Sequence, residues 1–335
     1  ALWRADGRFV GASLPGGLGW DPATGTVAAS YFALPGERYL GFGERGGSID
    51  RRGRVLWMKN SDLAAFNSLS DPLYISIPYF YTIREGKAAG VYVDSGALPF
   101  FDLDSAGNGL LTFGVASGDL DYYVMAGPQP IDVAKSYRQL TGPNQLPPLW
   151  TLGYHQSRYS YASQDETLSV AWWLRALQLP TDVLYFDIDY LDQLKMFTWN
   201  TLAFPDPAAM NLQLKDWGFH SANIMEPLNH VDDPLHQWLS LSGFYLTGWG
   251  GETLVNQIWF GMVSWLDFSR TATRDWYKAA LKGFLGAYHV DAVWNDLNEP
   301  AQNHMPEARY NFDGQPRSDA EARNLYALLE ARTSY

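Results

Sequence analysis

The sequence predicts two folds in succession, an N-terminal antiparallel β-sandwich and then a partial (β/α)8 barrel of about four β/α units. Short apolar and aromatic runs, broken by glycine, proline, asparagine and aspartate, fill the chain up to about Gly127. From Leu149 onward, apolar runs alternate with segments that carry helix-capping signals. We therefore expect a sandwich over residues 1–128, a linker with a short helix over 129–148, and barrel units over 149–335 with an insertion at about 229–270.

The composition excludes several classes of protein. The 335 residues include 24 basic and 36 acidic side chains, and the net charge of −12 argues against binding to nucleic acid or an anionic membrane surface. No run of about 18 apolar residues is present, so no membrane span is expected. The sequence has no cysteine, which rules out disulfides, thiolate metal sites and cysteine nucleophiles. The chain starts at Ala1 rather than methionine, so we expect the true N-terminus and any signal peptide to lie outside it; compartment and oligomeric state stay open.

Strand-forming runs predict the sandwich. Residues 72–83 and 89–94 are rich in tyrosine, isoleucine and valine and flank a turn at Gly86. The run from Gly41 to Gly46 matches the dinucleotide-binding pattern G-x-G-x-x-G, but that function requires a helix directly afterwards. Residues 48–57 instead have the composition of turn and strand, so a glycine-rich turn is the better interpretation.

Proline pairs and capping signals define the linker and the barrel units. Gly127 to Pro130 opens a short helix over 131–140, and Gly142-Pro143 with Pro147-Pro148 closes the linker. The later elements are expected, in chain order, as a strand over 149–156, a helix over 164–179, a strand over 182–187, a helix over 208–217, a strand over 219–225, a helix over 271–288 with Trp276, Ala280, Phe284 and Tyr288 on one face, a strand over 291–296, and a helix from the capping box Ser318–Glu321 towards Ala331. The alternation predicts a parallel sheet, interpreted as a barrel cut after its fourth unit; a compact doubly wound sheet is the alternative.

Acidic residues follow the predicted strands at the edge where barrels place their chemistry. These residues are Asp187 with Asp189, Glu226, and Asp296 with Glu299. Our central hypothesis is that Asp296 is a catalytic carboxylate; alternatively, it caps the following turn or pairs with an arginine. Carboxylates among tryptophans favour glycoside hydrolysis over metal-dependent or phosphoryl chemistry, so no metal is expected, although divalent-metal binding by these acids stays open. The histidines show no metal-ligand spacing.

The run from Trp294 to Pro300, W-N-D-L-N-E-P, resembles the W-x-D-M-N-E-P signature of glycoside hydrolase family 31, the α-glucosidase and α-xylosidase family. Gly41 to Glu44, Leu179 to Val183 and Asp187 to Tyr190 are also similar to family signatures, and they occur in the family's order along nearly the whole chain. The resemblance implies a retaining α-glycosidase that acts on oligosaccharides or small glycosides, with a β-sandwich on a (β/α)8 barrel and no cofactor.

The resemblance also implies roles for single residues. Asp296 falls on the family's nucleophile, and Asp187 on an acid that hydrogen-bonds hydroxyl groups of the cleaved sugar. Asp62 resembles an aspartate that a loop of the N-terminal domain lends to the site. Leu297 replaces the usual methionine at a substrate-contacting position, a change of little volume. The aromatic walls of the sugar subsite are implied to be Tyr159, Trp259 and Trp294, and Asp189 and Glu299 are implied to orient their neighbours through hydrogen bonds.

Besides Leu297, the sequence departs from the family pattern in other respects. Asn295 stands where an apolar residue is usual, and Glu226 stands where an aspartate is typical. The family's acid/base aspartate lies in a W-x-G-D-N type motif, which we expect beyond Tyr335. Two other functions stay open: a retaining β-glycosidase with Glu299 as acid/base, and a non-catalytic sugar-binding remnant. These residues do not specify whether the sugar is glucose, xylose or galactose. They also leave open the linkage and the choice between hydrolysis and transglycosylation.

Overall fold

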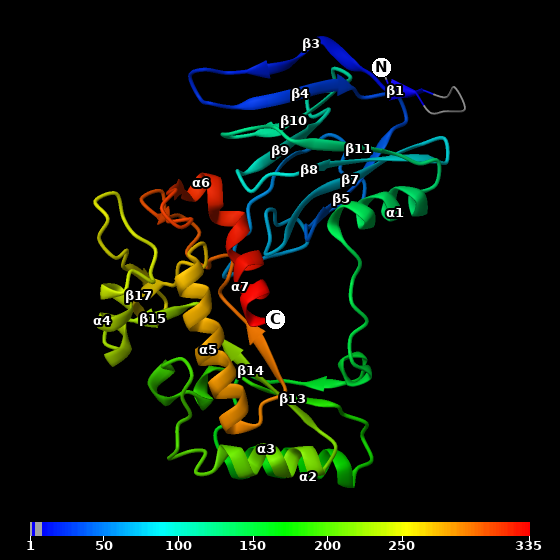
Figure 1. The fold of residues 1–335 in the computed structure, drawn as a ribbon. Coiled ribbons are helices and arrows are strands. Elements are labelled where there is room, and N and C mark those ends of the chain that lie inside the picture. The colour runs from blue at the N-terminus through cyan, green and yellow to red at the C-terminus, as the bar shows by residue number, and fades with distance from the viewer. Residues whose placement is uncertain (1, 4–8) are drawn as a thin grey trace. The chain divides into compact units, whose positions relative to one another are not determined.

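The computed structural model describes residues 2, 3 and 9–335, which form two compact units (Figure 1). The first, here called the sandwich unit, consists of the chain up to residue 144 together with residues 299–306 and 317–326. The second, the barrel unit, consists of residues 145–298, 307–316 and 327–335. Within the described ranges, no helix combines the length and the apolar character that a bilayer crossing requires.

The sandwich unit contains two antiparallel sheets, which confirms the predicted sandwich. A five-stranded sheet has the order β3-β4-β10-β9-β6, and a four-stranded sheet has the order β11-β8-β7-β5. A short pair, β1 and β2, precedes them. The strands are β1 (Leu2–Trp3), β2 (Phe9–Gly11), β3 (Ser13–Trp20), β4 (Val27–Phe32), β5 (Arg38–Gly43), β6 (Val55–Trp57), β7 (Ser76–Arg84), β8 (Lys87–Val93), β9 (Pro99–Leu103), β10 (Leu110–Val115) and β11 (Tyr122–Ala126).

Aromatic rings fill the core between the two sheets. Phe101 of β9 is fully buried, and its ring lies 5.1 Å from that of Phe42 and 5.5 Å from that of Phe80. Alternate residues of β9 are buried, as the two-residue period of a half-buried strand requires. The inward-facing side chains of both sheets therefore meet in one hydrophobic core.

The glycine-rich run at Gly41 belongs to a strand and not to a nucleotide-binding loop. It covers the end of β5, where the register with β7 shifts between Gly41 and Gly43. A Cβ atom on Gly43, which has φ +81°, would lie 2.3 Å from the Ile75 carbonyl oxygen, so only glycine fits this bulge. The following Arg45 is buried and pairs with Asp71.

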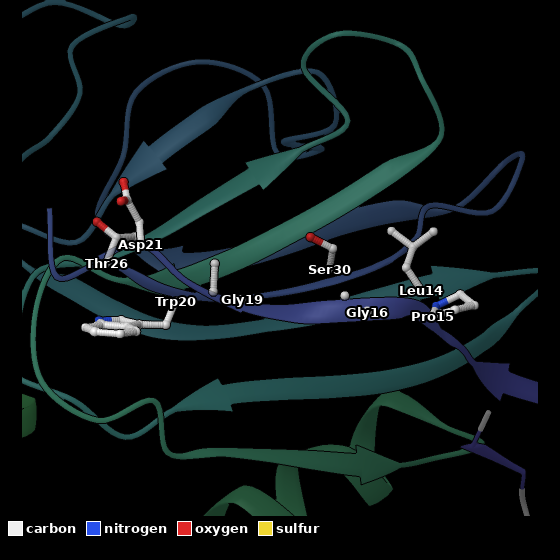
Figure 2. Close-up of a pocket in the computed structure, with 10 residues that line it drawn as sticks. Leu14, Pro15, Gly16, Gly19, Trp20, Asp21, Thr26 and Ser30 are labelled. Atoms are coloured by element: carbon white, nitrogen blue, oxygen red, sulfur yellow. The ribbon is translucent and has the colours of Figure 1, made fainter. Parts of the chain in front are cut away.

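The outer face of β3 and β4 carries a shallow groove of about 460 Å³ (Figure 2). Asp21, Thr26 and Ser30 point to one side of the sheet, and Trp20 points to the other. Glycines provide much of the remaining wall, so the groove has few side chains that could hold a ligand. It contains none of the residues to which the sequence assigns a functional role.

The linker helix α1 (Pro130–Thr141) forms as predicted and packs on the sandwich. Val133 is buried so close to β8 that a Cβ on Gly90 would lie 2.4 Å from its side chain. The ring of Tyr137 stacks on Tyr79 at 4.0 Å. The helix thereby covers part of the four-stranded sheet with apolar and aromatic side chains.

The barrel unit is built on a parallel sheet whose strand order, β12-β13-β14-β18, follows the chain. These strands are β12 (His155–Gln156), β13 (Val183–Phe186), β14 (His220–Met225) and β18 (Ala292–Asn295). Helices α2 (Gln164–Ala176), α3 (Pro207–Asp216) and α5 (Thr271–Tyr288) lie between successive strands in the chain. A doubly wound sheet reverses its strand order at a switch point, and this sheet does not, so that alternative is wrong. The sheet has the order of the first four strands of a barrel.

An insertion with its own small sheet separates β14 from α5. Its antiparallel strands have the order β15-β17-β16. The elements are β15 (Leu228–His230), α4 (Pro234–Leu241), β16 (Asn256–Ile258) and β17 (Gly261–Trp265). Two short strands, β19 (Arg309–Tyr310) and β20 (Arg317–Ser318), follow β18 in the chain.

Three element predictions need correction. Residues 149–156 are not one strand: Leu149–Leu152 is a 3₁₀ turn after two prolines, and β12 has only two residues. The last helix is divided into α6 (Asp319–Ala322) and α7 (Tyr326–Ser334) by a 3₁₀ turn, where the buried Arg323 turns inward and donates to the carbonyl oxygens of Pro300 and Gln302.

The third correction concerns α5, whose bounds are as predicted. Its fully buried residues are Thr273, Tyr277, Leu281 and Phe284. Of the predicted stripe, only Phe284 is fully buried, while Trp276, Ala280 and Tyr288 flank the buried line. The predicted helical spacing of the buried residues is correct, but the buried face is rotated by about one residue from the predicted face.

The sandwich core predicts the effect of truncating Phe101. Phe101→Ala leaves a cavity among Phe42, Phe80 and Phe113, so we expect a loss of about 3–5 kcal/mol in the unfolding free energy, measured by urea denaturation. Phe66→Ala is the matched control, since that ring is 62% exposed and should cost far less. Equal losses for the two variants would contradict this account of the core.

Candidate active site

The register of three parallel strands places three acidic residues on one face of the sheet. Ile224 of β14 pairs with Trp294 of β18, and side chains of a strand alternate between faces. Glu226 and Asp296 lie two residues further along and continue that face. The backbone amide of Asp296 donates to the Met225 carbonyl at 3.0 Å, so the parallel pairing extends to this edge.

Asp187 follows the end of the neighbouring strand, where Phe186 pairs with Asn223, so it is level with Ile224 and Trp294 and lies two residues before the level of the other two acids. It follows Tyr185 of β13 by two residues, and the rings of Tyr185 and Trp294 meet edge to face at 6.2 Å. Tyr185 and Trp294 therefore share a face of the sheet, and Asp187 lies at its carboxyl edge with Glu226 and Asp296. The structure thus places Asp187, Trp294 and Asp296 on the same face of the sheet, with Asp187 level with Trp294 and Asp296 two residues further along.

The three acids interact electrostatically. Burial raises the pKa of Glu226 to about 8, and the negative charges of Asp296 and then Asp187 add to this shift. Burial also raises the pKa of Asp187, and the charge of Asp189 contributes, while the backbone N–H of Ile188, which donates to the Asp187 carboxylate at 2.8 Å, opposes the shift. Burial and neighbouring negative charges thus raise the pKa values of Glu226 and Asp187, and shifted pKa values of this kind are common in catalytic centres.

The opposite face of the same strands is packed against aromatic side chains, and this fixes the strand ends. Phe186 lies 5.3 Å from the ring of Trp199 and 6.3 Å from that of Tyr190. The Tyr190 hydroxyl donates to the Ile224 carbonyl at 3.0 Å. Asn295 belongs to this face: its side chain accepts a hydrogen bond from Ser334 of α7 at 3.1 Å and points away from the acids.

A groove of about 520 Å³ lies beside Asp187, in the loops that follow the strands. Its walls include three predicted site residues, Tyr159, Asp189 and Trp259. Tyr159 is 71% exposed and Trp259, in the turn between β16 and β17, is 66% exposed, so both rings are available to a ligand. Ile188 and Asp189, the two residues that follow Asp187 in the chain, also line the groove.

The other predicted residues are placed differently. Trp294 is half-buried on the sheet and does not line this groove. Leu297 is buried directly after Asp296, with a left-handed backbone at φ +57°. Asp62 and Glu299 belong to the sandwich unit, where the Asp62 amide donates to the Asn303 side chain at 3.1 Å. The roles of Asp62 and Glu299 towards the acids of the barrel unit stay predictions.

Sequence reasoning assigned no role to two further residues. Glu226 was recognised as an acid at a strand end, but nothing in the sequence indicates its burial or its raised pKa. Gln193 lines the groove from a loop in which both Gln193 and Leu194 have positive φ. No sequence signal marks Gln193 or Leu194, because non-glycine residues adopt a positive φ only when their surroundings require it.

No group of three or more histidine, aspartate or glutamate side chains in the described part of the chain is arranged to hold a metal ion. The acids are instead spread along the carboxyl edge of a parallel β/α sheet, beside a groove with exposed aromatic rings. This combination is typical of barrels that hydrolyse glycosidic bonds.

Comparison with known proteins identifies the family. The family 31 glycosyl hydrolase TIM-barrel domain matches residues 144–335, and the galactose mutarotase-like N-terminal domain of glycosyl hydrolase 31 matches residues 18–102. The chain therefore belongs to glycoside hydrolase family 31, which confirms the resemblance seen in its motifs.

The relatives are longer than this chain. Alpha-glucosidase 2 of Bacillus thermoamyloliquefaciens is 33% identical over 308 residues, which cover 89% of this chain and 39% of that protein. An alpha-glucosidase of Saccharolobus solfataricus is 32% identical over 264 residues, covering 79% and 38%. A family 31 dextranase of Flavobacterium johnsoniae shares the fold with a TM-score of 0.90 at 24% identity, over 99% of this chain and 41% of that one. The chain thus spans about two fifths of the length of these proteins.

The raised pKa of Glu226 predicts a pH-dependent effect of Glu226→Gln on stability. An acid that binds its proton more tightly when folded stabilises the fold below its ordinary pKa of 4.5, and this stabilisation is lost as pH rises towards 8. Glutamine does not titrate, so the variant should match the wild type at pH 4.5 and exceed it by up to about 4 kcal/mol at pH 8, measured by denaturation.

The matched control for this experiment is Asp232→Asn, which replaces an exposed carboxylate by an amide in the same unit. It should change the unfolding free energy by less than about 0.5 kcal/mol at either pH. A Glu226→Gln difference that does not grow between the two pH values would contradict the raised pKa.

Proposed function

We propose that this chain carries the nucleophile of a retaining α-glycosidase that removes terminal, non-reducing α-linked glucose from oligosaccharides. The observation that supports this most directly is the position of Asp296, at the carboxyl edge of β18 within the region that matches the family's barrel domain. Two of the relatives named above are α-glucosidases, which supports glucose as the sugar. Membership of the family also disfavours the β-glycosidase interpretation of Glu299.

In the proposed mechanism, the Asp296 carboxylate attacks the anomeric carbon of the sugar through an oxocarbenium-like transition state. The glycosidic bond breaks, and a glycosyl ester forms on Asp296. Water then attacks the same carbon, releases the carboxylate and restores the original configuration. Retaining hydrolysis needs a second carboxyl group that first protonates the departing oxygen and then deprotonates water. We assign that role to a residue outside this sequence.

The remaining site residues would hold the sugar. Asp187 accepts hydrogen bonds from sugar hydroxyls, and Trp294 forms a wall of the subsite at the base of the acids. Tyr159 and Trp259 offer their exposed rings to the apolar faces of the substrate. Asp62 is assigned to the same subsite by its resemblance to the family's aspartate, and Leu297 contacts the sugar beside the nucleophile. Asp189 and Glu299 keep these residues in place through hydrogen bonds.

Replacing the nucleophile should abolish turnover. The full open reading frame that encodes this chain should hydrolyse p-nitrophenyl α-glucoside, and Asp296→Asn should lower kcat by about 10⁴-fold or more, because an amide cannot form the ester. Asp232→Asn should behave as the wild type. Glu299→Gln should only weaken turnover; a loss as large as that of Asp296→Asn, on a substrate whose leaving group needs protonation, would favour the β-glycosidase interpretation.

Removing an aromatic wall should weaken substrate binding more than the chemical step. Trp259→Ala is expected to raise KM for maltose about tenfold, since the stacking surface for a sugar ring is lost. Trp249→Ala is the matched control: this tryptophan lies in the same insertion, is also exposed, and packs on Arg309 instead of lining the groove. Equal effects of both variants on KM would argue that the groove does not bind substrate.

A further inference from the structure

Glu226 is the most deeply buried of the acids at the strand ends, and the proposed mechanism does not use it. Its side chain is only 2% exposed. Its backbone amide donates to the Met196 sulfur at 3.2 Å, but no hydrogen bond reaches its carboxyl group from any residue of the described ranges. A buried carboxylate without donors is costly, so this group has a strong reason to stay neutral.

The groups that face Glu226 are acidic or neutral. Asp296 approaches from the end of β18, and Asp187 from the end of β13. From the turn after β13, the Tyr190 hydroxyl lies near enough for its own pKa to be raised by the charge of Glu226, after the larger effect of its burial. Among the described residues, no cation is one of the groups that act on Glu226. Of the three acids, the most buried one, Glu226, is therefore the one with the strongest reason to keep its proton.

We propose that Glu226 is a positioning residue that remains a neutral acid during catalysis and donates a hydrogen bond to the carboxylate of Asp296. This inference rests on the proposed function of Asp296 as nucleophile. Glu226 and Asp296 follow the paired residues Met225 and Asn295 on adjacent strands, at the same level and on the same face. The hydrogen bond would fix which Asp296 oxygen is turned towards the anomeric carbon.

The proton stays on Glu226 throughout, so the balance of the reaction is unchanged. In the free enzyme, the hydrogen bond stabilises the Asp296 carboxylate. When the glycosyl ester forms, Asp296 loses its charge and the bond weakens. When water attacks the anomeric carbon, Asp296 departs as a carboxylate, and the donor on Glu226 stabilises that departing charge. Ionisation of Glu226 at alkaline pH removes the donor and puts a second negative charge beside the nucleophile.

The test is the pH dependence of turnover by the enzyme expressed from the full open reading frame. The substrate is α-glucosyl fluoride, whose fluoride leaves without a proton from the acid/base, so that residue does not define the alkaline limb. The variants are Glu226→Gln, which keeps a donor but does not titrate, and Glu226→Ala, which has no donor. Asp232→Asn, an exposed carboxylate change, is the control.

For the wild type and the control, we expect kcat to fall above pH 8, where Glu226 ionises. Glu226→Gln should lose that limb and stay within about tenfold of the wild-type rate at neutral pH, whereas Glu226→Ala should lose about 10- to 100-fold. An alkaline limb unchanged in Glu226→Gln, or wild-type rates in Glu226→Ala, would overturn the proposal.

An infrared measurement tests the proton itself and does not depend on activity. The wild type at neutral pH should show the C=O stretch of a protonated, buried carboxylic acid, and Glu226→Gln should lack that band. Absence of a difference between the two spectra would overturn the proposal even if Asp296 is the nucleophile. Full turnover by Asp296→Asn would instead refute the proposed function, so the two failures are distinguishable.

Discussion

The site depends on the parallel register of β13, β14 and β18. Because Ile224 pairs with Trp294, the residues two positions further on, Glu226 and Asp296, reach the same edge on the same face, and Asp187 joins them from β13. A slip of one residue in any of these strands would turn its acid towards the helices. The aromatic packing on the other face, from Phe186 to Trp199 and Tyr190, holds that register. The packed face thus provides the rigidity that the acidic face needs.

The same arrangement costs stability. Glu226 is buried beside two acids, and no cation in the part of the chain that the structure describes acts on it; its raised pKa is the direct result of that burial and repulsion. Proteins commonly tolerate a loss of stability at functional sites. Replacing Glu226 by a neutral residue would stabilise the fold, but it would also change the site. The proposed proton on Glu226 reconciles the two demands: it relieves the repulsion at neutral pH and provides a donor to Asp296.

The sequence predicted those features that depend on local patterns. Strand-forming runs and capping signals predicted the sandwich, the chain-ordered parallel sheet and the full length of α5. The motif around Asp296 predicted the family. The sequence did not predict the 3₁₀ turn at Leu149 or the break in the last helix at Arg323. The break at Arg323 depends on the carbonyl groups of Pro300 and Gln302, which only the folded chain brings close to Arg323. The sequence did not predict the burial of Glu226 either. Its desolvation results from the packing of neighbouring strands, which the local sequence around Glu226 and Pro227 does not reveal.

The central claim is that Asp296 forms a covalent bond to the sugar, and the most direct measurement is to trap that ester. The enzyme from the full open reading frame would be incubated with 5-fluoro-α-glucosyl fluoride, whose second fluorine destabilises the oxocarbenium-like transition state so that the glycosyl-enzyme accumulates. Proteolysis and mass spectrometry would then locate the label. We predict one added sugar on the peptide that contains Asp296, fragmented to that residue. A label on Glu299, on Asp187 or on a peptide without Asp296 would contradict the assignment of the nucleophile.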